Sequence, residues 1–309
     1  MTRIKNHAVA DKELYLAKLK NLKRPNTCIE GKNVEVGNRL VNRLIPADVI
    51  ANVGPFLLLD HGYPISYKKG APFSSGLNEH PHRGLVAFTY VIKGEVEHFD
   101  SLGNHAIVAE GGAHWLSAGK GLIHGERVSA SLVQSGGALH VIQCWINIPA
   151  AHKGDLPKYR ALDTDAFPVA PLPNQGGMIH ILLGKCGVYE SPVESLSQEF
   201  LYRVTLNAKS ACRISVAEET NYAVFVPDDP VIVNGDHIGK SQLLILENRN
   251  EEIVLRNPGI SNADAFILGG PEPTESLVAQ GPFVMNSREE IARAYRDFFA
   301  GEYGAIPRP

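Results

Sequence analysis

The chain has 309 residues, of which 44% are hydrophobic and 20% are charged, and its formal net charge is −3. This composition is that of a globular protein, and the length predicts two domains, because a single core seldom grows beyond roughly 250 residues. The balanced charge argues against direct binding of nucleic acid.

The sequence predicts neither a membrane span nor a signal peptide. No segment reaches the roughly 18 apolar residues of a membrane span, and residues 1–10 lack the apolar core of a signal peptide. The four cysteines lie far apart and form no CxxC pair, and Cys144 lies in the apolar run 139–146. A small buried thiol there, rather than a ligand or a disulfide partner, indicates a reducing cytoplasm.

The first predicted element is a short helix over 10–24, whose lysines indicate a solvated face. A β-rich region follows. Its clearest strand is 85–92, rich in β-branched and aromatic residues, and a second strand over 95–99 leads to a hairpin turn over 100–104. Short strands that alternate with glycine turns are typical of a sandwich or a barrel.

The second half of the chain repeats this β pattern after a segment with little periodicity and four prolines. We expect an architecture much like that of the first half, although no close internal repeat is visible. The predicted division is an N-terminal extension, a first β-domain, a linker, a second β-domain, and a C-terminal helix with its tail: 1–33, 34–150, 151–178, 179–286 and 287–309.

The C-terminal helix carries its own start and stop signals. Ser287 and Glu290 match a capping box, and Gly301 suits the helix end. Apolar residues follow the box at helical spacing and predict a stripe that packs on a domain. They are Ile291, Ala294, Tyr295, Phe298 and Phe299.

Two short pairs carry most of the functional information: His80-Pro81-His82 and His124-Gly125-Glu126. Residues two apart point to the same face of a β-strand. If the two strands face each other, three imidazoles and one carboxylate converge, which suits a divalent first-row metal and leaves positions for exogenous ligands. The second half contains only His152, His180 and His237, with no such pair.

Structural roles are expected for most other polar residues around these pairs. His98, His105, His114 and His140 are expected to make ordinary hydrogen bonds, and His98 would gain a role beside the metal only if its ring turned toward it. Arg83 has two interpretations: it holds a ligand carboxylate, or it makes a structural hydrogen bond at the barrel mouth.

Five segments resemble the pirin family, and the likeness that they mark extends over most of residues 40–304. They are Pro55-Phe56-Leu57-Leu58-Leu59-Asp60-His61, Asn78-Glu79-His80-Pro81-His82-Arg83-Gly84, Trp115-Leu116-Ser117-Ala118-Gly119-Lys120-Gly121-Leu122-Ile123-His124-Gly125-Glu126, Phe266-Ile267-Leu268-Gly269-Gly270 and Gly281-Pro282-Phe283-Val284-Met285-Asn286.

The resemblance implies an all-β fold of the cupin superfamily. Pirins are bicupins with two antiparallel β-barrel, or jelly-roll, domains, and here a short N-terminal helix and a C-terminal helix would be added. The resemblance also implies one iron in the first barrel, held by His80, His82, His124 and Glu126. One departure is Val86, where many relatives carry an acidic residue, and its absence leaves Glu126 as the carboxylate ligand.

The activity that the resemblance implies is quercetin 2,3-dioxygenase: O₂-dependent cleavage of a flavonol, a small aromatic substrate, with release of carbon monoxide. Glu126 would be a plain ligand or, if it leaves the metal, the base that takes the 3-hydroxyl proton. The alternative is a redox-sensitive iron protein that regulates a protein partner without turnover. A sugar-isomerase-type cupin ranks third. The resemblance favours Fe(II), whereas the ligand set itself also accepts Mn, Co, Ni, Cu and Zn.

Overall fold

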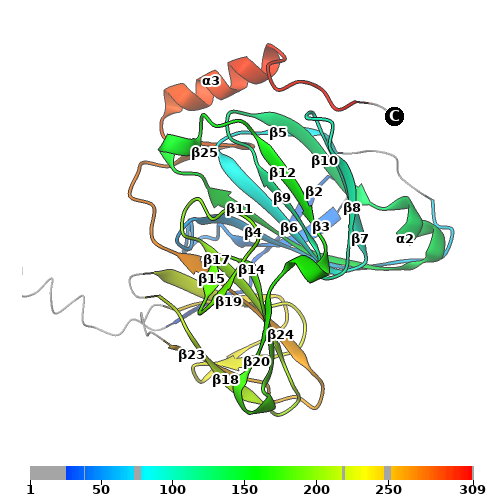
Figure 1. Ribbon diagram of the computed structural model, residues 1–309, viewed down its shortest axis with the longest axis vertical. Helices are drawn as coiled ribbons and strands as arrows, with labels where there is room; N and C mark the ends of the chain where they lie inside the picture. The colour runs from blue at the N-terminus through cyan, green and yellow to red at the C-terminus, as the bar shows by residue number, and fades with distance from the viewer. Residues whose placement is uncertain (1–25, 38, 73–77, 218–219, 247–251, 308–309) are drawn as a thin grey trace, which may run out of the picture.

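The computed structural model describes residues 26–37, 39–72, 78–217, 220–246 and 252–307. The helix expected over 10–24 lies outside these residues. In the described part of the chain every ladder between named strands is antiparallel, and the strands form two barrels placed one on the other (Figure 1). The expected all-β class with two barrels and a C-terminal helix is confirmed.

The first barrel combines a seven-stranded and a four-stranded sheet. The large sheet has the order β12-β9-β6-β11-β4-β3-β2 and the small one β5-β10-β7-β8. The bounds are β2 Lys32–Val36, β3 Arg39–Ile45, β4 Phe56–Tyr67, β5 His80–His82, β6 Leu85–Lys93, β7 Glu95–Asp100, β8 His105–Ala109, β9 Ala113–Ser117, β10 Leu122–Val128, β11 Gly137–Asn147 and β12 Lys158–Leu162.

The second barrel has the same seven-plus-four construction, as expected for a similar architecture. Its large sheet has the order β1-β22-β19-β24-β17-β14-β13 and its small sheet β18-β23-β20-β21. The bounds are β1 Thr27–Ile29, β13 Val169–Pro171, β14 Gly177–Leu183, β17 Phe200–Leu206, β18 Ala211–Ser215, β19 Asn221–Val226, β20 Val231–Val233, β21 Asp236–Ile238, β22 Gln242–Ile245, β23 Glu252–Arg256 and β24 Ala263–Gly270.

Short elements complete the described chain. They are the helices α2 Ala130–Ser135 and α3 Arg288–Phe299, the 3₁₀ turns η1 Ala150–His152, η2 Thr164–Ala166 and η3 Pro173–Gln175, and the two-stranded ribbons β15 Lys185–Cys186 with β16 Tyr189–Glu190 and β25 Val278–Gln280 with β26 Phe283–Met285. Neither α-helix of the described residues is long and apolar enough to cross a membrane.

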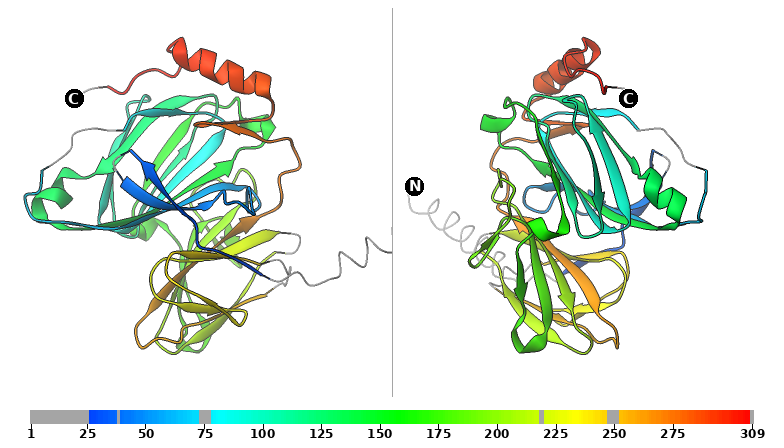
Figure 2. Two further views of the ribbon diagram at one scale, coloured as in Figure 1. Left: turned by 180° about the vertical axis from the view of Figure 1, so that it is seen from behind. Right: turned by 45° about the vertical axis from the view of Figure 1, so that its right-hand side comes forward.

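The first described strand belongs to the second barrel, and the C-terminal helix packs on the first. The strand β1 pairs with β22 of the second barrel before the chain enters the first. After β24, the chain returns to the first barrel, where α3 lies along one end (Figure 2). Between the barrels, β12 pairs with β9 and β13 pairs with β14, so the crossing lies between Leu162 and Val169.

The C-terminal helix begins as the capping box predicts. The Ser287 side chain accepts a hydrogen bond from the Glu290 backbone N–H, and the Glu290 carboxylate accepts from the N–H of Asn286. Ile291 and Ala294 are buried in a cluster with Phe283. The prediction for Phe299 was wrong: its side chain is 79% exposed, because its direction around the helix axis falls at the edge of the face that Ile291 and Phe298 bury.

The two large sheets pack face to face through one apolar cluster that both barrels share. Alternate residues of β6 and β11, such as Phe88 and Cys144, meet alternate residues of β19 and β24, such as Phe225 and Phe266. Phe266 is fully buried and contacts Tyr90 edge-on, with ring centroids 5.7 Å apart. This interface therefore fixes the relative position of the barrels. The expectation that Cys144 is a buried thiol is confirmed.

Phe266→Ala is expected to lower the free energy of unfolding by about 3–5 kcal/mol, the usual cost of removing a buried aromatic ring. Urea denaturation measures this change. Phe299→Ala is the matched control, because its exposed ring should change stability by less than about 0.5 kcal/mol. Equal effects of the two substitutions would contradict the assigned interface.

The interiors of the two barrels differ in chemistry. The second is filled by one continuous set of buried apolar residues from both of its sheets. In the first, two small apolar clusters are separated along β6 by Thr89, which lies opposite Gln143 of β11 and His114 of β9. Side chains that could serve a reaction therefore gather in the middle of the first barrel.

Candidate metal centre

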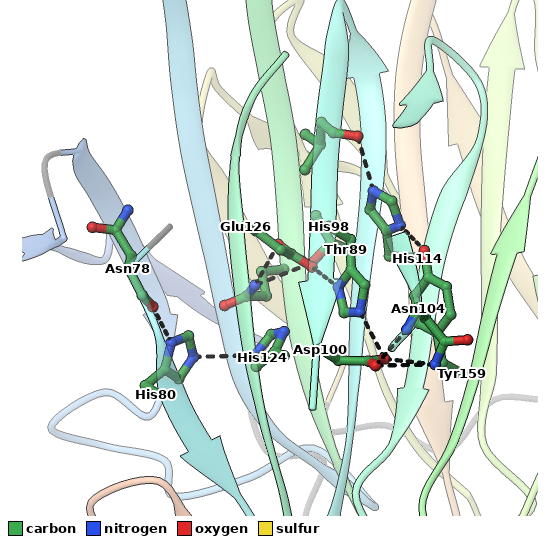
Figure 3. Close-up of polar contacts among 12 residues, drawn as sticks. Asn78, His80, Thr89, His98, Asp100, Asn104, His114, His124, Glu126 and Tyr159 are labelled. Carbon is green, nitrogen blue, oxygen red and sulfur yellow. Dashed lines mark hydrogen bonds and ion pairs between the residues drawn. The ribbon is translucent and has the colours of Figure 1, made fainter. Parts of the chain in front are cut away.

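The four predicted ligands lie on two neighbouring strands of the small sheet of the first barrel. The strand β10 lies between β5 and β7. Its register places His124 opposite His80 and Glu126 opposite His98, whereas Leu122 lies opposite His82. The i, i+2 spacing therefore brings both pairs to one face of the sheet, as Figure 3 shows for His80, His124 and Glu126.

Three imidazoles converge. His80, His82 and His124 each offer a ring nitrogen, and these atoms all lie within 4.8 Å of one another. The Nε2 atoms of His80 and His124 are 3.1 Å apart. Two nitrogens bound side by side to one ion, each at about 2.1 Å, would lie about 3 Å apart. The spacing therefore fits a shared first-row metal.

The hydrogen bonds of these rings direct the correct nitrogen toward the cluster. Nδ1 of His80 lies 2.6 Å from the Asn78 carbonyl oxygen, and Nδ1 of His82 lies 3.0 Å from the Pro282 carbonyl oxygen. Because a carbonyl can only accept, each Nδ1 carries the proton and each Nε2 presents a lone pair. Nδ1 of His124 is buried with no hydrogen-bond partner in the described structure.

Burial keeps two of the three rings, His82 and His124, in the neutral form that metal binding requires. It lowers the pKa of His82 to about 3, with the neighbouring His80 acting in the same direction, while the Pro282 carbonyl and Glu126 oppose the shift. Burial and the charges of nearby histidines lower the pKa of His124 well below its ordinary value. Both rings are therefore uncharged at neutral pH, with one nitrogen protonated and the other free to bind a metal.

Glu126 belongs to a second group that shares His124. Ligand atoms of His98, His124 and Glu126 also lie within 4.8 Å of one another. The Glu126 carboxylate accepts hydrogen bonds from Thr89 at 3.0 and 3.2 Å and from Gln143 at 3.4 Å. The four predicted ligands are thus brought together as two overlapping groups, with His124 in both.

The environment of Glu126 keeps its carboxylate ionised. Burial raises the pKa of this group, but the His98 ring, the His114 ring and the Thr89 hydroxyl outweigh burial and lower the pKa to about 2. A carboxylate with so low a pKa binds cations well and accepts protons poorly. This electrostatic setting favours Glu126 as a ligand over Glu126 as a base.

His98 is the site residue to which sequence reasoning gave too little weight. Its Nδ1 lies 3.8 Å from Glu126, its Nε2 lies 3.2 Å from Asp100, and its ring stacks on Tyr159 with centroids 4.1 Å apart (Figure 3). Burial lowers the pKa of His98, but Asp100 and Glu126 outweigh it and raise the pKa. The sequence held only a partial signal: His98 and Asp100 repeat the i, i+2 spacing of the other pairs and so share a strand face, but this spacing does not show which strand lies beside them.

The remaining histidines make the hydrogen bonds expected of structural residues. His114 bonds to Tyr159 and to the Val96 carbonyl, His105 to Glu97, and His140 to His61. These interpretations are confirmed.

Arg83 and Val86 both point away from the Glu126 carboxylate. Arg83 pairs with Asp297 of α3 at 2.6 Å and with the Tyr303 hydroxyl at 3.3 Å, so its structural interpretation is confirmed and the carboxylate-holding one is wrong. Val86 is fully buried in the cluster between the barrels. Because β6 alternates its faces, an acid at position 86 would lie on the side opposite Thr89.

The comparisons with known proteins agree with this architecture. Residues 37–146 match the family model described as Pirin, and residues 201–304 match the one described as Pirin C-terminal cupin domain. A Pseudomonas aeruginosa protein named "Putative quercetin 2,3-dioxygenase PA2418" is 31% identical over 252 residues, which cover 82% of this chain and 87% of the relative.

Solved structures give the same result. A crystal structure of quercetin 2,3-dioxygenase from Acinetobacter baumannii has a TM-score of 0.84 and 27% identity, covering 91% of this chain and 98% of that one. The bacterial pirin YhhW of Escherichia coli, in complex with nickel(II), has a TM-score of 0.63 at 20% identity and covers 81% of this chain and 100% of that one. These matches confirm the bicupin fold.

Proposed function

Because this chain belongs to the pirin family, we propose that it is a metal-dependent dioxygenase that cleaves a flavonol such as quercetin at a non-haem iron site in the first barrel. The observation that carries the proposal is the convergence of His80, His82 and His124, with two of the rings fixed by backbone carbonyls. The names of the relatives support the reaction class. The free thiols of the chain suit a reducing cytoplasm.

The proposed ligands are His80, His82, His124 and Glu126. A divalent first-row ion, Fe(II) in this proposal, would supply Lewis acidity toward a substrate hydroxyl group and a redox centre for O₂ chemistry. With a divalent ion bound by three imidazole ligands and one carboxylate, the site would carry a net positive charge, which would favour binding of an anionic flavonol. Thr89 and Gln143 hold the carboxylate oxygens and so limit the rotation of the Glu126 side chain.

Anaerobic purification, metal quantification and a quercetin assay under O₂ test the proposal. His80→Ala should lose both metal and turnover, because its Nε2 faces the cluster. His237→Ala, an exposed histidine in the second barrel, is the control and should keep both. Metal binding without turnover on several flavonols would instead support the regulatory, partner-binding function of a redox-sensitive iron protein.

A further inference from the structure

On its way from the second barrel to α3, the chain passes through a segment that contacts a proposed metal ligand. This return segment, residues 278–286, contains β25 and β26 and lies near β5 (Figure 1). The Pro282 carbonyl accepts the hydrogen bond from His82 Nδ1 at 3.0 Å. The orientation of the His82 ring thus depends on a residue 200 positions away along the chain.

The return segment is fastened to the end of β5 through its backbone. Phe283 forms a parallel bridge with Arg83, and the Val284 N–H donates to the Arg83 carbonyl at 3.0 Å. Gly84 has a φ of +74°, and a Cβ atom there would lie 2.0 Å from the Val284 carbonyl oxygen. The close approach of the two backbones therefore requires glycine at position 84.

A buried lysine holds the same contact from the other side. The side chain of Lys153, a residue only 4% exposed, donates to the carbonyls of Gly84 at 2.9 Å and Val284 at 2.8 Å and to the Asn147 side chain at 2.9 Å. All three ammonium donors are used. On the outer side, Arg83 pairs with Asp297 and so connects the same strand end to α3.

We propose that the return segment, held by Lys153 and accommodated by Gly84, positions His82 for metal binding, so that docking of this segment and metal affinity are thermodynamically coupled. The inference rests on the proposed metal site. A partner that fixes the second ring nitrogen of a ligating histidine sets its tautomer and direction. By linkage, an ion that favours this ring position also favours the docked segment.

Ni(II) titration of metal-free protein by calorimetry tests the coupling. Gly84→Ala pushes the Val284 carbonyl away and should weaken Ni(II) binding by roughly 10–100-fold, the usual effect of losing such a partner. Gly184→Ala is the matched control: its φ is +72° and its Cβ would lie 2.5 Å from the Glu199 carbonyl oxygen in the second barrel. It should lose comparable thermal stability but keep wild-type Ni(II) affinity.

Two further measurements cover a Gly84→Ala protein that does not fold. Lys153→Met removes the lysine hydrogen bonds without changing the backbone of β5 and should also weaken Ni(II) binding. In the wild-type protein, Ni(II) should slow hydrogen exchange in residues 283–285 and leave β24 unchanged. Unaltered exchange in 283–285, or equal Ni(II) affinity of the two alanine variants, overturns the coupling. A wild-type protein that binds no Ni(II) overturns the metal site itself.

Discussion

His124→Ala is expected to abolish stoichiometric metal binding, with an affinity loss well above the roughly 10–100-fold that outer partners alone produce. The reason is geometric: His124 belongs to both groups of converging ligand atoms, so one substitution removes a ligand atom from each group. Elemental analysis of the isolated protein and Ni(II) titration of the metal-free form measure the effect.

His105→Ala provides the control within the same barrel. The His105 side chain is 55% exposed, lies on β8 and bonds to Glu97. Its removal should leave metal content at the wild-type value. A His124→Ala protein that still holds one equivalent of metal would contradict the assignment of this centre, provided that circular dichroism shows both variants folded.

The metal-free protein is expected to lose stability steeply below pH 6.5. Burial lowers the pKa of His61 to about 3 and that of His114 to about 4. In the unfolded chain both would titrate near 6.5. Between these values the unfolded state binds protons that the native state cannot bind, so the stability present above pH 6.5 falls as the pH decreases.

The expected slope is about 1.4 kcal/mol per pH unit for each of these two histidines, which amounts to roughly 2 kcal/mol each by pH 5. Urea denaturation of metal-free protein at pH 7.5, 6 and 5 measures it. His61→Gln removes one titrating group, keeps a donor toward His140, and should reduce the slope by about 1.4 kcal/mol per pH unit. Identical slopes for the variant and the wild type would refute this origin of acid sensitivity.

The sequence predicts those features of the centre that depend on local geometry. The two-residue period of a strand is a property of the backbone, so His80 and His82, like His124 and Glu126, had to share a face once the strands were recognised. The same holds for the capping box at Ser287, which needs only neighbouring residues. These parts of the fold and the site follow from spacing alone.

The features that escaped prediction depend on contacts between distant segments. That β10 lies between β5 and β7, so that Glu126 faces His98, is set by strand order, for which no local signal exists. The hydrogen bond between His82 and Pro282 joins residues 200 positions apart, and the ion pair between Arg83 and Asp297 joins residues 214 positions apart. Contacts between residues so far apart in sequence depend on how the whole chain packs, and no short stretch of sequence encodes them.

The exchange of terminal regions between the barrels has a consequence for the evolution of this architecture. Since β1 completes a sheet of the second barrel and the return segment contacts a proposed ligand of the first, neither half is a self-sufficient module. A gene split at the crossing between Leu162 and Val169 would separate the second barrel from β1 and the first barrel from the return segment. The two halves therefore depend on each other structurally, and the half whose barrel interior is apolar supplies the segment that contacts His82.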